Sequence, residues 1–323
     1  MIKALLKASI FGMLGNSAVA GVRASRLRGS AAVTVLNLHR VAPDDASSYP
    51  PLDPKIFDRL LSFCKKHFEF VRFSDLGTAP TREPRRPQLI LSFDDGYKDF
   101  IEYAVPIMVS HGAVANQNVI PACIERGTPP VNVLAQDFIG RAPREVIGQL
   151  ELPGFEFRRE GEDRLRLGMR LCNFIKNRPI VEQNEISDIL LPQFGRVEEF
   201  RPTPMMSRAE VQQLASECEM GAHSFEHATM EFEEDAYVAE DARKCRRYMA
   251  DLLGEACEIY AFPNGSCREG QIELVEREGF KTVLLVGERF SRSNARRHHR
   301  LSIYGDSISE VRFRALGGFQ SVP

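Results

Sequence analysis

Short apolar runs rich in β-branched residues alternate with longer stretches of helical period along most of the chain. Residues 31–38 and 88–93 are examples of the first kind, and Ile56, Leu60 and Phe63 mark one apolar helix face. Strands that alternate with helices predict a parallel sheet or barrel. The predicted strands are 31–38, 88–93, 114–120, a short strand ending at residue 223, 258–262 and 282–286. The predicted helices are 56–67, 97–110 with a kink at Pro106, 207–218, 233–253 and 269–278.

The alternation stops between residues 131 and 203, a charge-rich stretch in which the pattern predicts two helices, near 160–176 and 180–192. We therefore expect a mostly helical insertion within one domain that spans 31–323. A long segment at this place suits a cap over the mouth of a barrel, or equally a decorative or dimer-forming subdomain.

Residues 1–30 are the second interruption, with five basic residues and no acid. The apolar stretch 8–22 is too short and too polar to span a membrane. Three interpretations stay open. The segment is a secretory signal cleaved near Ala18-Val19-Ala20, a basic segment lying on an anionic membrane face, or a tail without a role.

The composition, 43% hydrophobic and 27% charged residues, is that of a soluble globular protein. A formal net charge of -2 makes nucleic acid a poor hypothesis for a partner. The seven cysteines are odd in number and contain no C-x-x-C pair, which argues against a complete disulfide framework and a four-cysteine zinc site. We expect scattered buried thiols in a reducing compartment, which weighs against secretion.

Candidate chemistry falls at the ends of three predicted strands, where α/β domains usually carry it. The first group is Asp94-Asp95-Gly96. Two neighbouring carboxylates cannot both stay ionised without a cation or hydrogen-bond donors, so one acid on a metal and one free as a base is a consistent arrangement. A surface turn of the same composition is the alternative.

The second group is the pair His223 and His227, four residues apart. On a helical turn such imidazoles share a face and reach one ion, whereas the alternative is two solvent-facing histidines. The third group, 260–265, is an aromatic strand ending in Pro-Asn-Gly, which is either a binding turn or an ordinary strand end. The basic run 296–300 is interpreted as a solvated loop.

Taken in order, these groups resemble the motifs of the polysaccharide deacetylases, the nodulation-deacetylase-like domains of carbohydrate esterase family four. Ser92-Phe93-Asp94-Asp95-Gly96 looks like the family's T/S-F-D-D-G, and His223-Ser224-x-x-His227 looks like its H-S/T-x-x-H. Ala261-Phe262-Pro263-x-Gly265 is similar to the A-Y-P-x-G form of the subgroup that deacetylates poly-N-acetylglucosamine.

That subgroup has a permuted order, in which a strand ending in a histidine comes first, and residues 35–41 with His39 resemble this strand. The resemblance covers roughly 31–125 and 204–315. It implies an α/β fold, a distorted (β/α) barrel of about seven strands interrupted by the helical insertion 131–203.

The resemblance implies a metal site and two catalytic groups. Asp95, His223 and His227 would hold one divalent metal ion, with zinc as the first choice and iron, cobalt or manganese as alternatives. Asp94 would be the general base that takes a proton from water, and His39 the general acid that protonates the departing amine.

The resemblance also implies substrate-binding positions. A backbone N–H near Tyr97 would hold the developing oxyanion, and the turn Phe262-Pro263-Asn264 would line the sugar groove. Arg300 is similar to a basic residue that orients Asp94, with the histidines at 298 and 299 as rivals.

One strand departs from the family pattern. Where the family has Ala-Thr-x-Phe, this chain has Asn116-Gln117-Asn118, which predicts either an altered sugar subsite or a hydrogen-bonded core patch.

The leading functional hypothesis is a metal-dependent hydrolase that removes N-acetyl groups from an acetamido sugar of a bacterial surface or secreted polysaccharide, or of its lipid-linked precursor. One alternative is a related C–N hydrolase acting on a non-sugar amide or a formylated sugar. Another is a catalytically silent carbohydrate-binding domain. The expected location is the cytoplasm, peripheral to the inner membrane through residues 1–30, with export through an N-terminal signal as the alternative.

Overall fold

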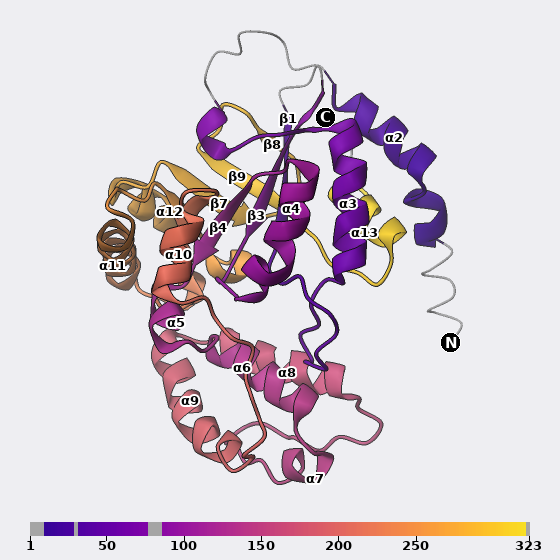
Figure 1. Ribbon diagram of the computed structural model, residues 1–323. Coiled ribbons are helices and arrows are strands. Elements are labelled where there is room, and N and C mark those ends of the chain that lie inside the picture. The colour runs from indigo at the N-terminus through magenta and orange to yellow at the C-terminus, as the bar shows by residue number, and fades with distance from the viewer. Residues whose placement is uncertain (1–9, 29–31, 77–85, 321–323) are drawn as a thin grey trace.

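Seven parallel strands close into a barrel surrounded by helices in the computed structural model, which describes residues 10–28, 32–76 and 86–320 (Figure 1). The ring closes because the first strand pairs with both the second and the last strand of the barrel. The barrel strands are, in spatial order, β1 (Ala32–Leu38), β3 (Gln88–Phe93), β4 (Ala115–Val119), β5 (Glu219–Ala222), β6 (Ile259–Ala261), β7 (Thr282–Val286) and β9 (Arg297–Ser302). The predicted fold class is thereby confirmed.

Two short strands extend this ring. β2 (Glu69–Phe70) pairs in parallel with the start of β3, and β8 (Ser291–Arg292) pairs antiparallel with the start of β1.

Side-chain alternation divides each barrel strand between an inner and an outer face. On β3, Leu89, Leu91 and Phe93 belong to the large core shared with the surrounding helices. Ile90 belongs to a separate, smaller apolar cluster with residues of β1, β6 and β7. The same alternation directs Ser92, and Asp94 just beyond the strand, toward the barrel axis.

Most of the helices lie outside the barrel and cover its apolar outer face (Figure 1). They are α3 (Pro54–His67), α4 (Val105–His111), α10 (Arg208–Leu214), α11 (Asp235–Leu253), α12 (Glu269–Arg277) and α13 (Ile308–Ala315). α5 (Pro121–Arg126) follows β4, and α2 (Ser17–Arg26) contacts α3 and α13. None of the helices within the described ranges is both long and apolar enough to cross a membrane.

The predicted helix 97–110 begins later and contains a π-helical turn, Phe100–Ala104, before α4. Pro106 has no backbone N–H to donate to residue 102, so the regular hydrogen-bond ladder is broken where the kink was predicted. Gly112 ends α4 with a φ of 65°.

Residues 131–203 contain α6 (Val131–Arg141), α7 (Arg144–Ile147), α8 (Arg164–Lys176) and α9 (Ile180–Phe194). These helices gather at one end of the molecule and share their own hydrophobic core, in which the rings of Phe138 and Phe194 stack at 4.1 Å (Figure 1). The pattern did not predict α6. Residues 132–139 are all buried, including the polar Asn132, Gln136 and Asp137, so the polar positions of this helix do not mark a solvent-facing stripe.

A buried ion network joins the insertion to the barrel. The Arg40 guanidinium, just after β1, donates to Asp99 Oδ2 at 2.8 Å and to Asp45 Oδ2 at 2.7 Å. Arg141 at the end of α6 pairs with the same Asp45 carboxylate. Arg40 is buried, whereas Arg141 and Asp45 are partly exposed, and removal of either arginine would leave a carboxylate with an incomplete partner set.

The interpretation of residues 296–300 as a solvated loop was wrong. Most of this run lies in β9, where His298 and Arg300 are buried. Alternation explains the burial, since every second residue of a barrel strand points inward and the intervening Arg297 faces outward, pairing with Glu276.

Candidate active site

The adjacent carboxylates of Asp94 and Asp95 lie at the end of β3 and face different partners. Both are buried, and Asp95 has a φ of 77°, followed by Gly96 with a φ of 90°. This left-handed backbone is costly for a non-glycine residue. It lets neighbouring side chains diverge, so that Asp95 meets the two histidines and Asp94 meets Arg300.

Asp95, His223 and His227 converge on one point. Asp95 Oδ1 lies 3.4 Å from His223 Nε2 and 3.6 Å from His227 Nε2, and the potential ligand atoms all lie within 4.8 Å of one another. Asp95 Oδ1 is buried and accepts no hydrogen bond. His223 Nδ1 lies 2.8 Å from the Ala261 carbonyl oxygen, which can only accept, so Nδ1 donates there and Nε2 is the ring nitrogen that faces the site. The donor set therefore fits a divalent metal ion.

The electrostatics of the trio agree with this fit. Burial raises the pKa of Asp95 to about 6, with His223 opposing the rise. Burial, and then the neighbouring His223, hold the pKa of His227 well below its ordinary value. Neutral imidazole is the form that binds metals, and a cation would offset the cost of the buried carboxylate.

The histidine segment 223–227 is not the helical turn that the spacing predicted. Ser224 and His227 have φ values of 58° and 65°, and no helix is assigned to this loop. Asp241 on α11 holds the loop, because its Oδ1 accepts the Ser224 hydroxyl and the Phe225 N–H, both at 2.9 Å. Both Nε2 atoms reach Asp95 through this loop geometry rather than through a shared helix face.

Asp94 is held at one oxygen and open at the other. Its Oδ1 accepts from Arg300 Nη1 at 2.7 Å and from Asn118 Nδ2 at 2.8 Å. Its Oδ2 lies 3.9 Å from His223 Nε2 and 4.0 Å from His39 Nε2. Burial opposes ionisation, but Arg300, His223 and His39 outweigh it and hold the pKa of Asp94 well below its usual range. An ionised carboxylate with one free oxygen can accept a proton from a nearby water.

Arg300 contacts Asp94 and not an accessible groove. Its side chain is fully buried, and it also donates to the Ser92 hydroxyl at 3.2 Å. This placement suits a residue that orients Asp94, and its predicted part in substrate binding stays a prediction.

Asn118 was named in the sequence only as part of a polar strand, without a role beside Asp94. Its amide donates to Asp94, and next to it Ser92 Oγ donates to Asn116 Oδ1 at 2.9 Å. The polar residues of β4 therefore form a hydrogen-bonded core patch, one of the two alternatives for this departure. The contact depends on the register that sets β4 beside β3, which a single strand's pattern does not encode.

We expect Asn118→Leu to lower kcat about tenfold to a hundredfold, because a hydrogen bond to a charged group contributes roughly 1.5–3 kcal/mol. KM and bound metal should stay unchanged, as Asn118 touches neither the ligand trio nor solvent. Asn116→Leu is the matched control, since Asn116 is equally buried on the same strand face and its amide bonds to Ser92 and to the Glu219 carbonyl oxygen rather than to Asp94. Equal kcat values for the two variants would show that Asn118 acts only on stability.

His39 stands at the open side of the centre. Its side chain is 32% exposed and its ring lies 6.2 Å from the Tyr49 ring. Burial lowers the pKa of His39, and Asp94 opposes the shift. A cavity of about 330 Å³ adjoins it, lined by Tyr49 and by Ile303 and Tyr304 beyond β9. The cavity joins two loops far apart in the chain, so no local pattern predicted it.

The other predicted substrate-binding residues differ in how far their side chains are exposed. Tyr97 and Phe262 are fully buried, the first with its ring 5.6 Å from the Arg40 guanidinium and the second 5.1 Å from the Tyr260 ring. Pro263 is also buried, and the predicted part of this turn in lining a sugar groove stays a prediction. Asn264 is exposed, with a φ of 57°, and donates to Thr229 Oγ1 at 2.8 Å. The oxyanion role of a backbone N–H near Tyr97 stays a prediction.

No curated protein matches the chain. Among solved structures, a Streptococcus pyogenes deacetylase, PplD, in complex with acetate has 14% identity and a TM-score of 0.56, covering 88% of this chain and 98% of its own. IcaB from Ammonifex degensii has 17% identity and a TM-score of 0.57 over 90% of this chain and 98% of its own. A de-N-acetylase from Aggregatibacter actinomycetemcomitans has 12% identity and a TM-score of 0.52 over 83% and 94%.

These likenesses concern the fold. The sequence model of the polysaccharide deacetylase family matches residues 171–283, a range that includes His223, His227 and the Pro-Asn-Gly turn. Over residues 171–283 the chain is thus similar to the polysaccharide deacetylase family, the family whose motifs the sequence resembles.

Proposed function

We propose that this protein is a metal-dependent hydrolase that removes N-acetyl groups from an acetamido sugar of a bacterial surface or secreted polysaccharide, or of its lipid-linked precursor. One observation carries the proposal. The free Oδ2 of an ionised Asp94 lies beside the convergent Asp95, His223 and His227, so a base and a cation site share one pocket. The PplD structure was solved with acetate, which is the acid product expected of this reaction.

Asp95, His223 and His227 would hold the ion, with zinc as the first choice for one carboxylate and two imidazoles and iron, cobalt or manganese as alternatives. When bound, such an ion supplies positive charge that polarises the acetamido carbonyl.

The chain's own side chains then move the protons. Asp94 Oδ2 takes a proton from a water molecule while the oxygen of that water bonds to the acetyl carbon. The hydrogen bonds from Arg300 and Asn118 keep the carboxylate in place. His39, on the open side of the centre, gives a proton to the nitrogen as the C–N bond breaks. The products are acetate and the free amine.

We further propose that the enzyme works in the cytoplasm, at the inner face of the inner membrane. In support, all seven cysteines are free thiols and most are buried, which suits a reducing compartment. The basic segment 1–30 is the proposed contact, and residues 1–9 and 29–30 of it lie outside the described ranges.

The experiment combines metal analysis with acetate release. We expect a chelator to abolish acetate release from acetylated glycans and added zinc to restore it. His223→Ala should lose both metal and activity, whereas His111→Ala, at a histidine paired with Asp58 on the outer helices, should keep both. Undiminished turnover without metal would refute the metal site. Faster hydrolysis of a formylated sugar or a non-sugar amide would move the function to a related C–N hydrolase, and glycan binding without any turnover would make the domain a silent one.

A further inference from the structure

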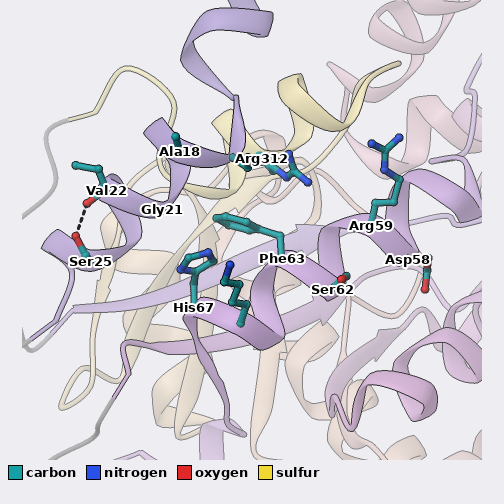
Figure 2. A pocket seen from close by; sticks show the side chains of 12 residues that line it. Ala18, Gly21, Val22, Ser25, Asp58, Arg59, Ser62, Phe63, His67 and Arg312 are labelled. Carbon is teal, nitrogen blue, oxygen red and sulfur yellow. Dashed lines mark hydrogen bonds between the residues drawn. The ribbon is translucent and has the colours of Figure 1, made fainter.

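A groove of about 700 Å³ that shares no lining residue with the catalytic centre lies between α2, α3 and α13 (Figure 2). α2 contributes one wall made of short side chains, among them Ala18, Gly21 and Ser25. The other wall is the face of α3 that carries Phe63 and His67, whose rings lie 4.6 Å apart. The short residues of α2 leave this space open, so its chemistry is set by α3 and α13.

Three cations line this groove, Arg59 and Lys66 from α3 and Arg312 from α13. Within the described part of the chain, none of them forms an ion pair, whereas other arginines such as Arg297 pair with carboxylates. The guanidinium of Arg312 lies 5.4 Å from the centre of the Phe63 ring, and its Nε is buried without a hydrogen-bond partner.

The balance of charge in the groove is positive. Asp58 is the one acid among its lining residues, and its carboxylate lies 2.8 Å from His111 Nε2. Burial, and then the nearby Arg59, lower the pKa of Arg312, as expected for a cation that lacks a counter-charge. An anion in the groove would remove this repulsion.

The rim of the groove is suited to a membrane surface. α2 buries Ala20 and Ala24 against its neighbours, while Val19 and Val22 are 39% and 54% exposed. Arg26, in the last turn of the same helix, is exposed as well. Exposed apolar side chains beside cations are the pattern of a helix that lies in a lipid interface.

We propose that this groove binds the phosphate of an anionic lipid headgroup, and that α2 lies on the membrane surface around it. Charge complementarity carries the assignment, since three cations without an ion-pair partner among the described residues surround a space whose one acid, Asp58, already lies against His111. The proposal does not depend on the deacetylation reaction, so either can fail without the other.

Sedimentation of the full chain with vesicles tests the proposal. Binding to phosphatidylcholine vesicles that contain phosphatidylglycerol should exceed binding to phosphatidylcholine alone. The triple variant Arg59→Gln/Lys66→Gln/Arg312→Gln should bind the anionic vesicles about 100-fold more weakly, since each cation near such a surface adds about 1 kcal/mol. Acetate release from a soluble substrate should be unchanged in this variant, which shows that its fold is intact.

A matched variant separates the groove from general electrostatics. Arg196→Gln/Arg277→Gln/Arg289→Gln removes the same charge from exposed positions on other elements and should keep nearly all vesicle binding. An equal loss in both triple variants would overturn the proposal, as would equal binding to neutral and anionic vesicles. Release from vesicles by inorganic phosphate, together with saturable stabilisation of the free protein by phosphate, would assign the groove to a soluble phosphate compound instead.

Discussion

Asp94→Asn leaves the fold and the metal content intact and lowers the rate of acetate release by about 10²–10⁴-fold, the usual contribution of a general base. The amide oxygen can take the place of Oδ1 and keep the hydrogen bonds from Arg300 and Asn118. The amide nitrogen then occupies the position of Oδ2, where it cannot accept a proton. The measurement is acetate release under saturating substrate, with the metal content determined on the same sample.

Asp137→Asn is the matched control for this variant. Asp137 is fully buried and also faces an arginine, Arg141 at 3.3 Å, but it lies on α6 in the insertion. Its substitution should change the rate little. If Asp94→Asn turned over at the wild-type rate with its metal bound, another group would have to be the base.

Arg300→Met lowers the free energy of unfolding by about 3–5 kcal/mol, the range seen when one partner of a buried ion pair is removed. Both side chains are almost completely buried, 0% and 1% exposed, and their charged atoms are 2.7 Å apart. The variant leaves the Asp94 carboxylate in the barrel without its guanidinium. Urea denaturation of the wild type and the variant measures the loss.

Two further variants test whether this loss of stability comes from the buried ion pair. Arg297→Met removes an arginine from the outward face of the same strand, where its pairs with Glu276 and Glu269 are partly exposed, and should cost less than about 1 kcal/mol. Arg300→Met combined with Asp94→Asn removes both buried charges and should recover most of the stability. A small loss for Arg300→Met alone would contradict the buried pair.

Local patterns predicted the parts of this protein that depend on neighbouring residues. The strand ends and the adjacent carboxylates of Asp94 and Asp95 could be recognised because each lies in one short segment. The spacing of His223 and His227 predicted the convergence of two imidazoles, but not the loop that produces it, since a four-residue interval does not distinguish a helical turn from a loop with positive φ angles.

Local sequence patterns could not predict the contacts between strands that are distant in the chain. Asn118 reaches Asp94 only because β4 lies beside β3, and the inward direction of Arg300 follows from a strand that its basic composition concealed. α6 was not predicted for a different reason, because its polar residues Asn132, Gln136 and Asp137 are buried together with its apolar ones and do not mark an exposed face.

The closed ring has a consequence for synthesis of the chain. Asp94 is synthesised early, but its partner Arg300 belongs to β9, the last barrel strand. β1 also lacks its second neighbour in the barrel until β9 has been synthesised. Until the ribosome has released β9, a nascent chain holds an unpaired carboxylate and an open sheet edge. Such contacts across the full length of a chain form slowly. Catalytic competence is therefore among the last properties the protein acquires, and a truncation before residue 297 yields a chain that is both inactive and prone to associate through its open edge.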